Sequence, residues 1–369
     1  MSSPNYVGRR NKLAKALKEA GVDSILVSGV SNVRYLTGFT GDSTWLFLSK
    51  TDTILISDSR YTTQLKNECG ELKVDIRDAK RPMSVAVADV VKKSKARNVG
   101  FESDHLTVAQ HQNLSEKIET ATLVPTSGLT ERLREIKDSW ELEQIKEAVR
   151  LAERGIAVVR SSLRPNQTER DVRYTLEAAM RSFGATGPGF EPIVGVGPTA
   201  ALPHAHAGDL LVSDSPVLLV DWGAETRSGY RSDLTRVFFT GKITKQMETV
   251  YRTVLKAHQA AIAAIKPGVE CRVVDGIARK IIADAGFDKY FGHGLGHGFG
   301  LDIHESVRMS PISEQVFETG MVVTVEPGIY LPGKFGVRIE DDILVTNDGH
   351  EVLSSVPREF DDAVVEFLA

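Results

Sequence analysis

Four carboxylates and one histidine, spread over the second half of the chain, carry the clearest chemical signal. They are Asp221, Asp233, His297, Glu326 and Glu340. Each acid lies inside or beside a short apolar or β-branched run, such as VLLVD, LTRVFF or MVVTVE, and such runs predict buried strands. An ionised carboxylate in a core costs several kcal/mol unless a cation compensates it, so the pattern predicts a site for divalent cations.

Ion pairing with arginine is the alternative explanation for these acids. Arg231, Arg236 and Arg338 are close to them in the chain and could serve as partners. That alternative does not account for His297, which stands in a glycine-rich segment between the two pairs of acids. Two divalent ions would balance four carboxylates, and one shared hydroxide would be the reactive group.

The glycine-rich segment Gly292–Gly300 resembles a phosphate-binding loop at first sight. No GxGxxG register fits it, however, and no strand–turn–helix frame surrounds it. We therefore expect its glycines to let the backbone run close to a site while His293 and His297 point into it. His304 begins an HExxH-like pattern, but Arg308 stands where the second histidine should be. No GxSxG is present, which argues against a serine hydrolase.

The elements that must position these residues indicate two α/β domains, residues 1–130 and 131–369. Five strands are expected in the first domain, within residues 23–28, 44–49, 52–57, 96–102 and 121–125. Helices are expected at Val7–Ala20, Tyr61–Asn67, Met83–Ser94 and Val108–Ile118.

The second domain shows signs of internal duplication. A long helix starts near Ser139, with Glu141 completing a capping box, and Thr168 caps a second helix. LRPNQTERDV and IKPGVECRVV share a proline, a preceding basic residue and a following arginine, and the glycines Gly184 and Gly286 follow at the same offset. Two helix–helix–strand–strand copies would bring Asp221 and Asp233 to face Glu326 and Glu340.

Composition narrows the function further. The net charge of -4 gives no reason to expect nucleic acid or an anionic membrane as a partner. No run approaches the length of a membrane span and the start lacks an apolar leader, so a cytoplasmic protein is expected. Cys69 and Cys271 form no CxxC pair, which argues against a disulfide framework and a thiolate metal site.

The ordered motifs VDWG, RSDLTR, GHGLGHGFGLDIHE, TVEPGIY and GVRIEDD resemble the proline-specific metallopeptidases of the pita-bread fold, the aminopeptidase P and prolidase family. At the front, GVSNVRYLTGFTG and SDSRY are similar to that family's N-terminal domain. The resemblance implies an α/β fold, with a small N-terminal domain followed by a pita-bread catalytic domain that has an internal pseudo-two-fold duplication. It also implies a homodimer, in which Asp42 could close a neighbour's pocket.

The resemblance also implies a role for each site residue. Asp221 and Asp233 would bind one ion, His297 and Glu326 would help to bind the other, and Asp233 and Glu340 would bridge both. His293 would contact the substrate and steady the transition state, and Glu326 would pass a proton to the leaving nitrogen. On the substrate side the matching residues are His204, His304 and Arg338; His206 has no clear counterpart.

This ligand set is rich in oxygen, which favours Mn²⁺ and leaves Co²⁺ or Fe²⁺ plausible. We expect a bridging hydroxide to attack the carbonyl before a proline at the second position of a peptide. Dipeptide-only prolidases usually add a basic residue shortly before the TVEPG strand, and here only Arg308 is available. An Xaa-Pro aminopeptidase is therefore favoured, and an Xaa-Pro dipeptidase is the alternative. A non-catalytic peptide-binding or protein-binding module is a more remote alternative.

Overall fold

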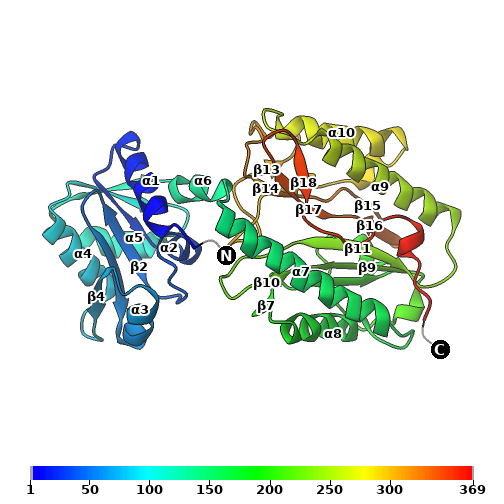
Figure 1. The fold of residues 1–369 in the computed structure, drawn as a ribbon, viewed down its shortest axis with the longest axis horizontal. Coiled ribbons are helices and arrows are strands. Elements are labelled where there is room, and N and C mark those ends of the chain that lie inside the picture. The colour runs from blue at the N-terminus through cyan, green and yellow to red at the C-terminus, as the bar shows by residue number, and fades with distance from the viewer. Residues whose placement is uncertain (1–2, 368–369) are drawn as a thin grey trace. The chain divides into compact units, whose positions relative to one another are not determined.

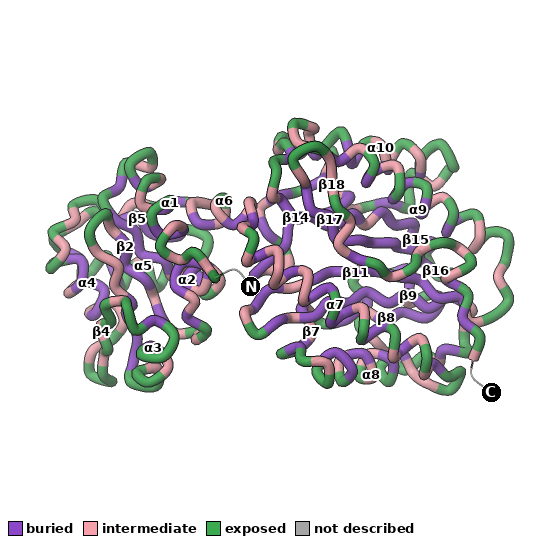
Figure 2. Tube along the Cα trace, in the orientation of Figure 1, coloured by how far each residue is buried: buried purple, intermediate pink, exposed green. Residues whose placement is uncertain are grey.

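The computed structural model describes residues 3–367, which form two compact units (Figure 1). The first is Ser3–Arg134 and the second begins at Glu135. Buried residues concentrate on the strands of each unit, whereas the helices alternate between buried and exposed positions (Figure 2). The predicted α/β class is confirmed. No helix within residues 3–367 has both the length and the apolar composition needed to cross a membrane.

The first unit is built on a six-stranded mixed sheet with the strand order β4-β3-β2-β1-β5-β6. The strands are β1 (Ser24–Val27), β2 (Trp45–Ser49), β3 (Thr53–Asp58), β4 (Lys73–Arg77), β5 (Asn98–Glu102) and β6 (Thr122–Thr126). β1, β2 and β3 pair antiparallel, and the pairs β1–β5, β5–β6 and β3–β4 are parallel. The five strands expected from the sequence are all present, and the edge strand β4 was missed.

Six helices accompany this sheet. They are α1 (Tyr6–Glu19), α2 (Val30–Thr37), α3 (Thr62–Glu68), α4 (Met83–Ser94), α5 (Val108–Lys117) and α6 (Leu129–Glu135). Four of them match the predicted helices to within one residue at each end. The short helices α2 and α6 were not predicted; α2 has no side-chain cap at its first turn, so its start signal is weak.

The second unit repeats one arrangement twice, a helix pair followed by a three-stranded antiparallel sheet. The first copy contains α7 (Ser139–Ser162), α8 (Glu169–Ser182), β8 (Ile193–Val196), β9 (Val217–Trp222) and β11 (Leu234–Phe239). The second contains α9 (Lys245–Ala264), α10 (Cys271–Asp284), β14 (Val322–Val325), β17 (Asp341–Val345) and β18 (His350–Val352). The predicted capping box of α7 and the predicted Thr168 cap of α8 are confirmed, and both glycines that follow the second helices have positive φ.

Strand β9 separates two cores, which explains how the site is oriented. Leu218, Val220 and Trp222 pack in the core formed with α7 and α8. Val217 and Leu219 pack in the other core, which includes α9 and α10. Because side chains alternate along a strand, Asp221 belongs to the same face as Leu219 and points toward the second copy.

The two copies meet where β11 lies beside the start of β17, with an antiparallel bridge between Thr235 and Glu340. Short ladders complete the unit: β7 (Gly187–Pro188) with β10 (Ala224–Glu225), β12 (Gly296–His297) with β13 (Arg308–Met309), and β15 (Gly328–Leu331) with β16 (Phe335–Arg338). The β15–β16 hairpin connects β14 to β17. It thereby brings the residues that follow β14 close to those that precede β17.

Candidate active site

The structure brings the predicted acids together from both copies. Asp221 is the next-to-last residue of β9 and lies opposite Thr235, and Asp233 directly precedes β11. Glu326 follows β14 and Glu340 precedes β17, one step beyond the pairing of Val325 with Asp341. All four line one cavity of about 700 Å³. One ligand atom from each of Asp233, His297 and Glu340 lies within 4.8 Å of the others.

His297 faces this group of acids from β12. A Cβ on Gly296 would lie 2.1 Å from the Thr324 carbonyl oxygen, so only glycine lets β12 approach β14 this closely. The Nδ1 atom of His297 is 3.2 Å from the Gly298 carbonyl oxygen. Since a carbonyl oxygen can only accept, Nδ1 carries the proton and donates this hydrogen bond. Its Nε2 lone pair therefore faces Glu326 Oε1 at 3.4 Å and Asp233 Oδ2 at 3.6 Å.

The acids of the site lack enough positive charge around them. Burial raises the pKa of Glu326 to about 8. Burial, together with the neighbouring carboxylates, also raises the pKa values of Asp233 and Glu340 well above their usual range. Among residues 3–367, the buried Oδ1 atom of Asp221 has no hydrogen-bond partner. Carboxylate oxygens and an imidazole lone pair aimed at one another fit a divalent cation site.

The arginine alternative accounts for one of the four acids. Arg338 forms a short ion pair with Asp221, although burial still raises the pKa of that carboxyl. Arg231 pairs with Glu225 and Arg236 pairs with Asp341, so both contribute their charge elsewhere. A single guanidinium beside four buried carboxylates leaves a large negative excess.

His293 is held by a chain of hydrogen bonds that starts at Arg338. Arg338 Nη1 donates to the Tyr330 hydroxyl oxygen over 2.8 Å, and that oxygen lies 2.9 Å from His293 Nε2. The Gly294 carbonyl oxygen can only accept, so the proton of neutral His293 lies on Nδ1 and Nε2 accepts from the Tyr330 hydroxyl. His293 Nδ1 then donates to the Gly294 carbonyl over 2.8 Å. Burial, followed by the charge of Arg338, lowers the pKa of His293 to about 4, which keeps the ring neutral.

His304 lies beside His297, with ring centroids 4.4 Å apart and planes at 81°. The segment that carries it is held by Glu305, which accepts backbone hydrogen bonds from Leu301 and Asp302. Lys137, in the segment before α7, donates to Glu305 Oε2 over 2.9 Å, and both side chains are buried. His304 therefore projects into the cavity from a firmly held loop.

The remaining predicted substrate residues also line the cavity. His204 does so from the segment after β8, and the exposed His206 lies beside it. Arg338 lines it as well, but its side chain is buried and bonded to Asp221, Thr235 and Tyr330. Apolar side chains complete the wall: Phe190, Ile193, Ile303 and Met309.

Two residues of the site escaped the sequence analysis. Tyr330 lies four residues after Glu326, and Thr235 lies two residues after Asp233. Thr235 Oγ1 accepts from Arg338 Nε over 3.0 Å and donates to Glu340 Oε2 over 2.6 Å. The available signal for Thr235 was strand alternation, which places residues two apart on one face.

A second group with possible metal ligands occurs in the first unit, at Glu102, His105 and Glu131. Glu102 Oε2 accepts from the backbone N–H groups of Ser28 and Gly29 at 2.7 and 2.8 Å, ahead of α2. Burial raises the pKa of Glu102 as well, but the two backbone N–H groups that donate to this carboxylate oppose that effect.

Comparison with known proteins gives a consistent result over the whole chain. The profile of metallopeptidase family M24 matches residues 143–347. The profile of the creatinase/prolidase N-terminal domain matches residues 9–136. The uncharacterized peptidase YqhT of Bacillus subtilis (strain 168) is 37% identical over 348 residues, which cover 94% of this chain and 98% of that protein.

Solved structures agree with these matches. A structure described as an Xaa-Pro dipeptidase from Bacillus anthracis has a TM-score of 0.93 and 37% identity, covering 98% of this chain and 100% of that one. An X-Pro aminopeptidase from Thermotoga maritima MSB8 has a TM-score of 0.86 and 32% identity, covering 95% and 99%. Both kinds of relative therefore share the complete two-domain arrangement.

Proposed function

Because the chain belongs to metallopeptidase family M24, we propose that it hydrolyses the bond between the first residue of a peptide and a proline at the second position. The observation that carries this proposal is the convergence of four under-compensated acids and His297 on one cavity. The names of the similar structures support proline-directed specificity.

We propose that two divalent ions are held by Asp221, Asp233, His297, Glu326 and Glu340, with Asp233 and Glu340 shared between them. The oxygen-rich donor set favours Mn²⁺, ahead of Co²⁺ or Fe²⁺. Bound ions would polarise the scissile carbonyl and lower the pKa of a water molecule. The lone pair of His297 Nε2, fixed by the bond from Nδ1 to Gly298, is ready to serve as a ligand.

The chain's own residues would select and orient the substrate. A proline nitrogen in a peptide carries no N–H, so its ring needs an apolar wall rather than a hydrogen-bond acceptor. Phe190 and Ile303 supply apolar surface in the cavity, and His204 and His304 lie at its rim for contacts with the peptide. Arg338 acts on the substrate side by holding Tyr330 and Asp221 in place.

Proton movement is assigned to Glu326 and His293. Glu326, which lines the cavity, would carry a proton to the leaving proline nitrogen. For His293 to donate to the oxyanion, its proton must move from Nδ1 to Nε2. The bond to Gly294 would then be lost, because the present tautomer donates there.

A stricter specificity for dipeptides is the second candidate, and one observation favours it. Arg308 pairs with His297 across the β12–β13 ladder and lines the cavity, where its guanidinium could hold a free carboxylate. A volume of about 700 Å³, in contrast, leaves room for residues beyond the proline. The aminopeptidase therefore remains our first choice.

The test is hydrolysis of Ala-Pro, Ala-Pro-Ala and Ala-Ala-Ala after loading with Mn²⁺, with elemental analysis of the purified protein. We expect about two metal ions per chain, cleavage of both proline peptides and none of Ala-Ala-Ala. Arg308→Met should raise KM for Ala-Pro and leave Ala-Pro-Ala unchanged if Arg308 holds the carboxylate. A folded, metal-free protein without Xaa-Pro hydrolysis would overturn the proposal and favour a binding module.

A homodimer and a cytoplasmic location also stay proposals. Asp42 is exposed and accepts hydrogen bonds from Tyr61 and Ser43, so its side chain has a defined orientation at the surface of the first unit. If it completes a neighbour's pocket, Asp42→Ala should lower activity without loss of metal. Light scattering of the native protein would give the number of chains.

A further inference from the structure

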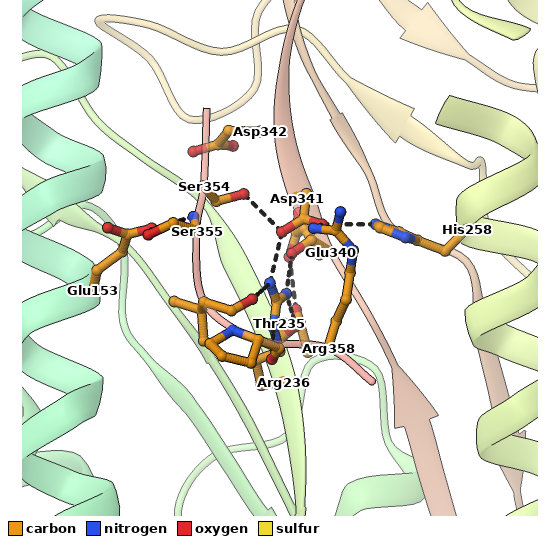
Figure 3. Close-up of polar contacts among 12 residues, drawn as sticks. Glu153, Thr235, Arg236, His258, Glu340, Asp341, Asp342, Ser354, Ser355 and Arg358 are labelled. Atoms are coloured by element: carbon orange, nitrogen blue, oxygen red, sulfur yellow. Dashed lines mark hydrogen bonds and ion pairs between the residues drawn. The ribbon is translucent and has the colours of Figure 1, made fainter. Parts of the chain in front are cut away.

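A second polar cluster lies where β11 meets β17, next to the candidate metal site (Figure 3). We call it the seam cluster; its members are Arg236, His258, Asp341, Ser354 and Arg358. Its central residue is Arg236, which is only 2% exposed. Neither the family resemblance nor the candidate ligand set gives this cluster a role.

Every N–H donor of Arg236 has an acceptor. Nη1 donates to the carbonyl oxygens of Thr235 at 2.9 Å and Glu340 at 2.6 Å. Nη2 donates to Asp341 Oδ1 at 2.7 Å and the Val356 carbonyl at 2.6 Å, and Nε donates to the Pro357 carbonyl at 3.1 Å. Five donors matched to five acceptors fix the guanidinium completely, and a lysine with three donors could not replace it.

Asp341 is the anionic counterpart of Arg236, and it is fully buried. Its Oδ1 also accepts from the Ser354 hydroxyl at 2.7 Å, and its Oδ2 accepts from Arg358 Nη1 at 2.5 Å. Ser354 and Arg358 belong to the segment that follows β18. The seam cluster therefore joins β11, the start of β17 and the C-terminal segment in one network.

This network holds Glu340 at its backbone and its side chain. The Glu340 N–H donates to the Thr235 carbonyl at 3.2 Å, and its own carbonyl accepts from Arg236. The Thr235 hydroxyl donates to Glu340 Oε2. Thr235 and Arg236 are neighbours on β11, only two and three residues after Asp233. The position of Glu340 relative to Asp233 is thus set by contacts behind the cavity.

We propose that Arg236 and Asp341 are positioning residues that fix Glu340 at the spacing from Asp233 that ion binding requires. This inference rests on the proposed function, in which Asp233 and Glu340 share the bound ions. A metal site has to be held within about 0.5 Å of its working geometry. Substitution of residues that hold the metal ligands in place typically lowers metal affinity by about 10-fold to 100-fold.

The experiment compares three arginine-to-methionine variants of the full chain. Arg236→Met removes the five donors, and Arg358→Met removes one contact at the more exposed edge of the cluster. Arg252→Met is the matched control, because Arg252 on α9 contacts Glu248 and the ring of Phe360 instead. The readouts are the Kd of the metal-free protein for Mn²⁺, measured by calorimetry, and the visible spectrum of the Co²⁺-loaded protein.

We expect Arg236→Met to weaken Mn²⁺ binding about tenfold or more and Arg358→Met to weaken it a few-fold. The Co²⁺ spectrum should change in both, and Arg252→Met should match the native protein. Native Kd values and spectra in both seam variants would show a purely structural role and overturn the inference. If Arg236→Met does not fold, Arg358→Met decides. A native protein that binds no Mn²⁺ would instead overturn the proposed function.

Discussion

Glu340 and Asp341 are neighbours in the chain where β17 begins, yet they lie in opposite electrostatic environments. Glu340 points to the cavity, where burial and other carboxylates raise its pKa well above the usual range. Asp341 points to the seam cluster. Burial opposes its ionisation too, but Arg236, His258 and Arg358 outweigh that effect and lower its pKa. Near Glu340 the buried guanidinium of Arg338 does not offset four carboxylates, whereas the seam cluster supplies enough positive charge for Asp341.

This difference shows how a buried acid can be interpreted. A carboxylate whose oxygens are met by arginines and hydroxyls stabilises the fold, as Asp341 does. A buried carboxylate that lies beside other carboxylates and an imidazole lone pair indicates a binding site for a positively charged ligand. Four predictions test this difference between the cavity and the seam cluster, and they follow in order of decreasing expected effect.

The largest effect is expected from Glu340→Gln. Removing one site acid should lower Xaa-Pro hydrolysis by more than the roughly 100-fold that loss of an outer residue can cost. It should also weaken Mn²⁺ binding, whereas the metal-free protein should melt at the same temperature or higher, since repulsion is relieved. Activity assays and melts in EDTA check this. Asp284→Asn, at the exposed end of α10, is the control. Native activity in Glu340→Gln would contradict the proposed site.

Asp341→Ala should produce the opposite pattern in the metal-free protein. Two buried or half-buried guanidinium groups would lose their carboxylate, and breaking a buried pair costs about 3–5 kcal/mol. Urea unfolding in EDTA measures this free energy. A loss below about 1 kcal/mol would mean that the seam cluster is not the stabilising half of the comparison.

The third prediction concerns how the thermal stability of the metal-free protein depends on pH. Burial raises the folded-state pKa of Glu326 to about 8, above the ordinary glutamate value of 4.5, so its protonated form stabilises the metal-free fold. That stability is fully present below about pH 4.5 and is lost as pH rises through about 8. Asp341 has a lowered pKa and stays ionised over this range, so it adds no slope. Melting temperatures in EDTA should therefore fall from pH 5 to 8.

Manganese should remove most of this slope, because a cation favours the ionised acids and its binding releases protons. The same pH series with Mn²⁺ present is the comparison to run. Melting temperatures that rise with pH in EDTA would show that the cavity acids are already compensated in the metal-free protein.

The smallest effect should come from Tyr330→Phe, which removes two hydrogen bonds from the cavity, those with His293 and Arg338, but no charge. His293 Nε2 would lose its donor, and a hydrogen bond is worth about 0.5–1.5 kcal/mol net. We expect kcat to fall by roughly tenfold or less, with Mn²⁺ affinity within about twofold of native. Calorimetry and steady-state kinetics check the two quantities separately. Loss of metal in this variant would show that the cavity depends on its hydrogen bonds as much as on its charges.

The acids of the cavity could be predicted from the sequence, whereas the seam cluster could not. Asp221 and Glu326 stand out because an acid at the end of an apolar run breaks the pattern of a buried strand. Arg236 and Asp341 break the pattern equally, but their meaning depends on five acceptors from three separate segments, most of them backbone carbonyls. The sequence analysis considered Arg236 as a partner for the site acids, whereas the structure pairs it with Asp341.

The prediction of secondary structure from the sequence is limited in a similar way. The apolar runs beside Asp221 and Asp233 predicted β9 and β11, and the antiparallel register of these strands places Asp221 opposite Thr235. The edge strand β4 is mostly exposed, so its sequence lacks the apolar run that identified the other strands. The role of Tyr330 required the direction of a hydrogen bond from Arg338, which only coordinates supply.

The buried pair of Lys137 and Glu305 has a practical consequence for anyone preparing the second unit alone. A recombinant fragment starting at Ser139, the first residue of α7, would omit the ammonium group that lies 2.9 Å from the Glu305 carboxylate. Glu305, in the loop that bears His304, would then be buried without the charge of Lys137, which would lower the stability of the fold by several kcal/mol. Cloning from Glu135 retains this pair and the hydrogen bond from Ser306 to Glu135.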